Sequence, residues 1–532
     1  MCDAASSSTG QAAGCQDFTY SVYQHGDGAS EGLEGRVGDR KPEGGSPSVL
    51  ALHPESKGFT MPPLRPGLSL VAWAALLGAL CSCLPVRPPP PREESGLLRY
   101  HVTYVREPRH ALEVGLVRVG EGAPRDFLFS QPGGVERVRV LGRDGSEREL
   151  PVSAEGHVLV PPDTRSLRYR YPLDARARGR HAGFFSGLGE GDAWHVAGRA
   201  WLLRPRSVGP ESRAELVVEG VDALLPWAPG ANGIYQLSGD DLVNSGFHAF
   251  GGRRCTVRLP GGVLEVAVLG RPSHMDDAAL CAWLERSARE VLTVRHSFPY
   301  PRATVSLVTV PAREEPVPFG MVLWSTPPSI SLLVGQDAEP AAFTRDWVAV
   351  HELLHLAHPP ILPRVAWLSE GLATYYTELA RARSGRQTPE RAWTELLAGF
   401  ERARRAVGSR TMEDVVTRGD SYLGTYWTGA LVALHLDVEL RRVTGNTRSL
   451  DDVLERLAES GPAATFDAFG AAVDAVAGRP LFRELLSRHL SRPALAELAP
   501  LLEALGVEPA PDGVRLAGAR DSSLRDALVA PR

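Results

Sequence analysis

Two histidines and two glutamates stand close together in one stretch of the sequence. His351 and His355 are four residues apart in HELLH, Glu352 lies beside the first of them, and Glu370 follows in WLSEG. Residues four apart lie on one face of a helix, so both imidazoles can reach a single cation. A catalytic zinc takes three protein ligands and keeps a fourth position for water. This pattern predicts His351, His355 and Glu370 as ligands of Zn²⁺ and Glu352 as the base that takes a proton from water.

The residues around the motif predict that it lies on a buried helix. Leucines fill the positions between and after the two histidines, so the imidazoles need polar partners in the interior. The double proline that follows ends this helix, and a second helix is expected over 365–385. Two antiparallel helices can bring Glu370 to the histidines. These features argue against the alternative of a helix whose histidines are exposed or satisfied within the core.

A further histidine offers a weaker alternative for the third ligand. His358 lies seven residues after His351, on a similar helix face, but directly before the proline break. The HExxHxxGxxH pattern of other zinc peptidases needs a glycine and a third histidine in register, and PPILP supplies neither. Glu370 is therefore the better third ligand.

HELLHLAH followed by WLSEGLATYY resembles the gluzincin metallopeptidases, which use HExxH and a later glutamate. YWTGALVALHLDVELRRVTGNTRSLDDVLERL is most similar to the glycyl aminopeptidase family within that group. The resemblance covers roughly 98–507 and is strongest over 345–457. It implies a zinc peptidase with a thermolysin-like catalytic domain that acts on peptide or protein substrates.

The same resemblance implies a role for one tyrosine. Tyr426, in TYWTG, matches the residue that donates a hydrogen bond to the developing oxyanion. A phenol aimed at the oxyanion complements a metal on the other side of the carbonyl. Tyr422, one helical turn earlier, is the alternative, and either ring could instead belong to the core.

The sequence departs from the family in two places. Aminopeptidases of this group carry a strand in which a glutamate grips the free amino terminus of the substrate. FGMVLWS is the candidate stretch, and Val322 stands where that glutamate would fall. The family also often carries a PDZ domain, for which the roughly 25 residues after Val507 are too few. The first departure puts the preference for free amino termini in doubt.

The rest of the chain predicts an α+β multidomain protein. Short alternating strands over 98–255 favour a sandwich or saddle-like sheet. A thermolysin-like zinc domain is expected over 256–450, with strands first and helices afterwards, and a helical part over 451–507. Residues 508–532 are short and polar, and we expect them to form a partly ordered tail.

Length and charge set broad limits on the function. A chain of 532 residues is too long for one ordinary core. The net charge is −5, and no block of lysine and arginine stands out, so nothing indicates a nucleic-acid partner.

Residues 61–83 have the layout of a bacterial lipoprotein signal peptide. A basic residue precedes a short apolar run, and LCSC resembles a lipobox in which Cys83 receives the lipid. The proline-rich segment 84–97 reads as a tether to the folded part. Residues 1–60 lack hydrophobic periodicity and are interpreted as a disordered or mis-assigned extension. An ordinary cleaved signal with two incidental cysteines is the alternative.

Two cysteines remain in the folded part. Cys255 and Cys281 could pair in an oxidising envelope, or they could be two separate buried thiols. The sequence leaves this open.

These observations together predict a zinc-dependent metallopeptidase, lipid-anchored in the bacterial cell envelope. Whether it is an exopeptidase or an endopeptidase is left open. The alternative is a catalytically inactive binding lipoprotein of the gluzincin fold. The retention of Glu352 argues against it, because a binding protein has no physical need for that carboxylate.

Overall fold

The computed structural model describes residues 96–120, 122–131, 134–174 and 183–531. The predicted extension, the signal peptide with Cys83 and nearly all of the tether lie outside the described residues. No helix among the described residues has the length and apolar character needed to cross a membrane.

Strands with alternating burial open the described chain, as the sequence pattern predicts. In β1 (Leu97–Val105), Tyr100, Val102 and Tyr104 are buried while Arg99 and His101 are exposed. Successive side chains of a strand point to opposite faces, so one face of the sheet can pack on a core and the other can meet water. The sheet has seven strands in the order β13 (Tyr235–Ser238), β11 (Arg213–Glu219), β1, β2 (Ala111–Val119), β7 (Thr164–Pro172), β4 (Glu136–Gly142) and β5 (Glu147–Glu149).

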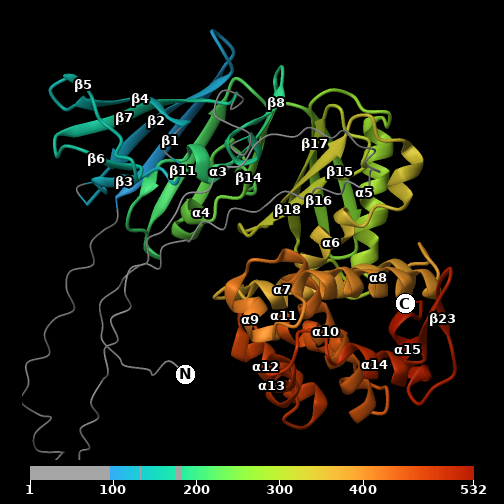
Figure 1. Ribbon diagram of the computed structural model, residues 1–532. Coiled ribbons are helices and arrows are strands. Elements are labelled where there is room, and N and C mark those ends of the chain that lie inside the picture. Colours follow the sequence, from blue (N-terminus) through green and yellow to red (C-terminus); the bar gives the residue numbers. More distant parts are fainter. Residues whose placement is uncertain (1–95, 121, 132–133, 175–182, 532) are drawn as a thin grey trace, which may run out of the picture. The chain divides into compact units, whose positions relative to one another are not determined.

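Smaller elements cover the buried face of this sheet (Figure 1). Tyr100 and Tyr169 on the sheet donate hydrogen bonds to the carbonyls of Leu203 and Trp201, which tie those elements to it. The elements are the sheet β10 (Arg204–Pro205), β3 (Asp126–Leu128), β6 (His157–Leu159); the sheet β12 (Ala223–Leu224), β14 (Phe247–Phe250), β9 (Ala193–Ala197), β8 (Leu188–Glu190); and the helices α2 (Gly183–Ser186), α3 (Gly198–Trp201) and α4 (Gly239–Val243).

A second, five-stranded sheet follows. Its order is β15 (Arg253–Leu259), β16 (Gly262–Leu269), β17 (Arg302–Val310), β19 (Ser329–Gly335) and β18 (Phe319–Leu323). Strands β16, β17 and β19 are parallel, and β18 closes the sheet as an antiparallel edge strand. Residues Ala303 to Thr309 of β17 are all buried, which is typical of a parallel strand covered on both faces.

The two cysteines of the folded part are paired. Cys255 lies in β15 and Cys281 in α5 (Asp277–Val291), with a Cα–Cα distance of 6.7 Å. The structure therefore selects the disulfide over the two separate thiols.

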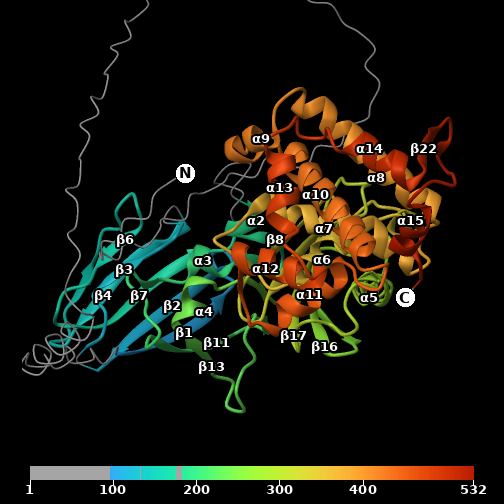
Figure 2. The same ribbon diagram turned by 90° about the horizontal axis from the view of Figure 1, so that it is seen from below.

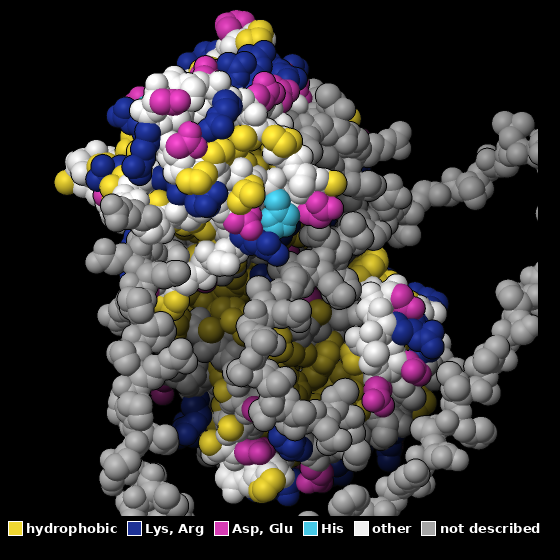
Figure 3. All heavy atoms as spheres, turned by 90° about the vertical axis from the view of Figure 1, so that its left-hand side faces the viewer, with side chains coloured by type: hydrophobic (Ala, Val, Ile, Leu, Met, Phe, Trp, Pro, Cys, Tyr) yellow, Lys and Arg dark blue, Asp and Glu magenta, His cyan; other side chains and the backbone are white. Residues whose placement is uncertain are grey.

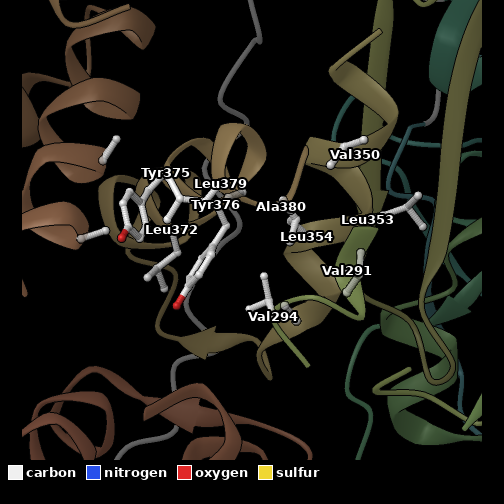
Figure 4. Packing of buried hydrophobic residues seen from close by; sticks show 14 of the residues in the cluster. Val291, Val294, Val350, Leu353, Leu354, Leu372, Tyr375, Tyr376, Leu379 and Ala380 are labelled. Atoms are coloured by element: carbon white, nitrogen blue, oxygen red, sulfur yellow. The ribbon is translucent and has the colours of Figure 1, made fainter. Parts of the chain in front are cut away.

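The remaining chain is largely helical, as predicted, and shares one hydrophobic core with the five-stranded sheet. Figure 4 shows Leu353 and Leu354 of the motif helix near Val291 of α5, with Tyr375 and Tyr376 from the next helix in the same cluster. The helices are α6 (Val348–Leu354), α7 (Ala366–Arg383), α8 (Pro389–Val407), α9 (Met412–Arg418), α10 (Tyr422–Val443), α11 (Leu450–Glu459), α12 (Phe466–Ala477), α13 (Phe482–Leu490) and α14 (Leu498–Leu505). Helices α12 and α13 pack against each other and lie side by side in Figures 1 and 2. The predicted α+β architecture is confirmed.

The expected polar tail is wrong. Residues after α14 form the hairpin β22 (Val507–Ala510) and β23 (Gly513–Leu516), followed by α15 (Ser522–Val529). Leu524, Leu528 and Val529 are buried, and α15 packs on α7. Only Leu524 and Leu528 are four residues apart on one helix face, and so short an apolar stripe does not stand out from the polar residues around it.

Charged side chains of both signs are interspersed on the face of the molecule shown in Figure 3. Among the described residues, exposed ion pairs include Arg99 with Glu215, on the paired strands β1 and β11, at 2.8 Å, and Arg148 with Asp163 at 3.0 Å. Exposed pairs of this kind contribute little to stability.

Candidate metal centre

The helix that carries His351 and Glu352, α6, is short, and the side chain of Asp346 caps its start. Asp346 accepts hydrogen bonds from the backbone N–H groups of Val348 and Ala349, which are free at a helix start. Burial raises the pKa of Asp346 to about 6. The α-helix ends at Leu354, and the chain continues as a 3₁₀ turn over His355–Ala357 before the two prolines. The four-residue spacing of the histidines thus spans the junction of the α-helix and the tighter turn.

Two glycines set the distance between the helices that carry Glu370 and Tyr426. A Cβ atom on Gly371 of α7 would lie 2.5 Å from Cα of Gly429 in α10. A Cβ atom on Gly429 would lie 1.8 Å from the carbonyl oxygen of Trp367. Only glycine at both positions lets the two backbones come this close. Glu370 directly precedes one of these glycines, and Tyr426 stands three residues before the other, so the crossing places both side chains.

The structure brings the three predicted metal ligands together. Nε2 of His351 and Nε2 of His355 each lie 3.3 Å from Oε2 of Glu370. The ligand atoms of the three residues all lie within 4.8 Å of one another. Both histidines are buried, and the side chain of Glu370 is 16% exposed. The three donors therefore converge on one point at the edge of the interior.

This donor set fits Zn²⁺. Zinc bound by histidine nitrogen and carboxylate oxygen has bonds of about 2.0–2.2 Å in a tetrahedral arrangement. Two ligand atoms of such a tetrahedron are about 3.3–3.6 Å apart. The two nitrogen–oxygen distances of 3.3 Å agree with that spacing. Two imidazoles and one carboxylate are also a ligand set that zinc hydrolases use.

The charges of the three ligands are coupled. Burial lowers the pKa of His351. Burial also opposes the charged form of His355, but the nearby Glu370 carboxylate outweighs it and raises the pKa of His355. Burial alone would raise the pKa of Glu370, yet the two histidines hold that pKa well below its usual range. Glu370 is therefore an ionised carboxylate, the form that binds a metal.

Glu352 lies between the metal ligands and the edge strand β18. Its side chain is buried, and burial raises its pKa to about 7. The backbone N–H of Val322 donates a hydrogen bond to the Glu352 carboxylate. A Cβ atom on Gly320 would lie 2.5 Å from Cγ of Glu352, so this glycine allows the strand to approach. A carboxylate with a pKa near neutrality suits general-base catalysis.

Tyr426 lies beside the first metal ligand. Its ring is stacked on the imidazole of His351, with ring centroids 5.9 Å apart and planes 4° from parallel. Tyr426 is half-buried, whereas the alternative, Tyr422, is 40% exposed and meets Tyr426 edge to face. The structure therefore favours Tyr426 as the tyrosine of the site.

The outer supports of the ligands are sparse. Ser369 Oγ lies 3.5 Å from Nδ1 of His355. Nδ1 of His351 is buried and has no hydrogen-bond partner among the described residues. His358, the weaker ligand candidate, donates from Nδ1 to the carbonyl of Pro359 at 2.8 Å and is not among the clustered donors. It therefore does not complete the ligand set.

Sequence reasoning missed the residues that position the site. Gly371, Gly429 and Gly320 have no chemistry of their own, and a glycine inside a helix pattern normally indicates a helix end. A signal was present, because a glycine follows Glu370 directly and another stands three residues after Tyr426. Both lie within long apolar helices, where a glycine that does not end the helix indicates close helix packing.

Known proteins resemble this chain in structure but not detectably in sequence. No family model matches the chain, and no curated protein matches it. An aminopeptidase N family protein from Idiomarina loihiensis superposes with a TM-score of 0.60 at 16% identity, covering 77% of this chain and 78% of that one. An M1 zinc metallopeptidase from Deinococcus radiodurans gives 0.45 at 16% identity, covering 75% and 94%. Native yeast LTA4 hydrolase gives 0.44 at 12% identity, covering 80% and 72%.

The first of these likenesses establishes the fold. An N-terminal β domain followed by a mixed sheet and helices is the architecture of the aminopeptidase N type, as the predicted resemblance to gluzincins implied. At 16% identity the likeness supports the fold and leaves the activity to the site itself.

Proposed function

We propose that the protein is a zinc-dependent peptidase that hydrolyses peptide bonds. One observation carries the proposal. The donor nitrogens of two buried histidines each lie 3.3 Å from one oxygen of the ionised Glu370, a distance that fits a tetrahedral zinc site, with Glu352 beside them. The fold of an aminopeptidase N family protein supports the same assignment.

The residues around this point have complementary roles. His351, His355 and Glu370 would hold Zn²⁺, which when bound polarises a carbonyl and makes water a better nucleophile. Glu352 takes a proton from the attacking water and later gives it to the leaving amine. Tyr426 donates a hydrogen bond to the oxygen on which negative charge develops. The water oxygen ends in the new carboxylate, and the C–N bond breaks as the amine gains its proton.

Replacing Glu352 with glutamine tests this assignment. The variant keeps the size of the side chain but cannot accept the proton, so we expect peptide cleavage to fall by about 10²–10⁴-fold or more. Bound zinc, measured by mass spectrometry after dialysis, should stay at the wild-type level. Glu339→Gln, at a side chain that is 77% exposed, is the matched control. Undiminished cleavage by Glu352→Gln would reject the assignment, and zinc binding without cleavage by the wild type would favour the inactive binding protein.

We further propose that the protein is lipid-anchored in the cell envelope through Cys83. The lipobox-like LCSC supports this location. The Cys255–Cys281 disulfide supports an oxidising compartment. Expression of the full chain in a bacterial host should give a membrane-bound product that incorporates labelled fatty acid, whereas Cys83→Ala should incorporate none. Equal labelling of both proteins would contradict the anchor.

A further inference from the structure

Covalent geometry fixes where a free amino terminus would lie in this site. In a substrate cleaved after its first residue, the amino nitrogen is two bonds from the scissile carbonyl carbon, which is about 2.5 Å. The carbonyl must lie beside Glu352, Tyr426 and the metal ligands to react. A terminal ammonium would therefore sit next to the metal cation, and it would need a carboxylate to compensate its charge.

The acidic groups of the centre are already engaged. Glu370 is paired with both histidines, and Glu352 serves as the base. Besides burial and the Val322 N–H, the charged groups acting on the Glu352 carboxyl are His355 and Glu370. Those on His355 come from Glu370, Glu352 and the exposed Arg364, which adds positive charge. An ammonium group in this centre would lie near the positive charge of Arg364, and both nearby carboxylates, Glu370 and Glu352, already have other partners or roles.

The strand beside the base is apolar. β18 reads FGMVL, and alternate residues of a strand share a face, so Gly320 and Val322 both face Glu352. Val322 is 9% exposed as a residue and belongs to the hydrophobic core. On the opposite face, Phe319 packs edge to face on Phe184 at a centroid distance of 4.8 Å. The wall next to the base therefore offers hydrocarbon and backbone groups.

The same strand can hold a continuous peptide. β18 is the edge of its sheet, and one side of its backbone is not paired with β19 or any other strand of that sheet. An extended chain can add to such an edge through main-chain hydrogen bonds. A substrate that continues past the scissile bond in both directions gains these hydrogen bonds. The nitrogen two bonds before its scissile carbonyl carbon is then a neutral amide and not an ammonium.

We propose that the site selects substrates whose residue before the scissile bond carries an acylated, uncharged nitrogen, which makes the enzyme an endopeptidase. This rests on the proposed zinc peptidase function and names its substrate class. The reaction is R–CO–NH–R′ + H₂O → R–COO⁻ + H₃N⁺–R′, with no other reactant. We assign the specificity to Val322, because it lies on the strand beside Glu352, its backbone N–H meets that carboxylate, and its side chain carries no charge that could compensate an ammonium.

A pair of peptide libraries tests the proposal on the wild-type protein. Both contain the same randomised sequences, one with free amino termini and the other N-acetylated. We expect cleavage at internal bonds, and the bond after an N-acetylated first residue should be cut at least ten times faster than the same bond after a free one. Faster removal of free first residues would overturn the inference while leaving a zinc peptidase. Cleavage of neither library by the zinc-loaded protein would reject the proposed function and the inference with it.

Binding gives a readout that does not depend on turnover. Two peptides with the scissile amide replaced by a ketomethylene group, one with a free amino terminus and one acetylated, are titrated calorimetrically against the zinc-loaded protein. The acetylated peptide should bind at least ten times more tightly. Equal affinity, or tighter binding of the free amine, would contradict the proposal.

A variant pair tests the role of Val322. Val322→Glu should reverse the preference toward free amino termini by at least tenfold in both assays. Met321→Glu adds the same charge one residue away, on the other face of the strand, and should leave the preference unchanged. Zinc content and thermal unfolding show whether each variant folds. An unchanged preference in a folded Val322→Glu protein would remove Val322 from this role, and the wild-type assays decide the substrate class if that variant does not fold.

Discussion

Two polar clusters of opposite character both use residues of α7 and α10, and α6 completes one of them while α11 completes the other. Near the starts of α7 and α10, Glu370 and Tyr426 belong to the metal centre. Further along lies a buried ion network: Arg441 donates to Asp437 at 3.0 Å, and Arg383 donates to Asp451 at 3.0 Å. The tyrosines Tyr375 and Tyr376 donate to the same two carboxylates at 2.8 and 2.7 Å.

The comparison shows which cluster is complete in itself. In the ion network each aspartate accepts hydrogen bonds from an arginine and a tyrosine, so each buried carboxylate has a cation beside it. In the metal centre the carboxylate of Glu370 meets only imidazole partners in its ion pairs, and Glu352 adds a second acidic group. A metal binds histidine in its neutral form, so a bound divalent cation would balance the two carboxylates. The centre therefore fits a metal, whereas the ion network is closed by its own arginines.

Removing one arginine of the ion network should give the largest effect. Arg383→Met leaves Asp451 buried without its cation, and breaking a buried pair in this way costs about 3–5 kcal/mol. Urea unfolding measures the loss. Arg289→Met, at an exposed pair with Glu285 on one helix, should cost less than about 0.5 kcal/mol. A loss below about 1 kcal/mol for Arg383→Met would show that the network does not stabilise the fold.

Removing one metal ligand should lower the affinity for zinc and leave the fold intact. Glu370→Gln removes a charged ligand, and loss of a supporting partner alone lowers metal affinity by 10–100-fold. We expect at least a 100-fold loss of zinc affinity, about 2.8 kcal/mol, measured by competition with a fluorescent chelator. The unfolding free energy of the metal-free protein should change less than in Arg383→Met. Wild-type zinc affinity in Glu370→Gln would remove this residue from the ligand set.

The close contact between Gly371 of α7 and Gly429 of α10 sets how these two helices pack. Because both helices contribute residues to both clusters, a change at this contact should disturb both. Gly429→Ala places a methyl group against the backbone of Trp367, and overpacking of this kind costs about 1–3 kcal/mol. Cleavage should also fall by about 10²-fold, because a shift of about 1 Å at a catalytic site has that effect. Gly518→Ala, where nothing lies within 4 Å of the added carbon, is the control. Full activity and stability in Gly429→Ala would show that the close crossing does not position the site.

The smallest of these expected effects is a loss of unfolding free energy at alkaline pH, through the buried tyrosine Tyr376 of the ion network. Burial raises the pKa of Tyr376 well above its ordinary value of 10. Because the folded-state pKa is the higher one, the stabilisation is complete below pH 10 and is lost as the pH rises above it, by about 1.4 kcal/mol per pH unit. Tyr376→Phe should flatten the pH dependence of urea unfolding above pH 10 by that amount. Parallel curves for the two proteins would contradict the assignment.

The sequence predicted the metal ligands because they are close along the chain. His351, His355 and Glu370 span 20 residues, and helix geometry alone brings the first two together. The ion network and the contact between the two glycines join residues far apart in the chain: Gly429 comes 58 positions after Gly371, and Asp451 comes 68 positions after Arg383. Spacing along the chain contains no information on such contacts, which depend on how the helices pack. Tyr426 was found through the family resemblance and not through spacing.

Titration of the metal-free protein with Zn²⁺ tests the central claim most directly. The chelator-treated protein is given increasing zinc while bound metal and cleavage of an N-acetylated peptide library are both measured. The proposed site predicts one tightly bound zinc per chain, with cleavage rising in proportion to bound zinc and levelling at one equivalent. Full cleavage before any zinc is added, or no zinc bound at saturation, would contradict it.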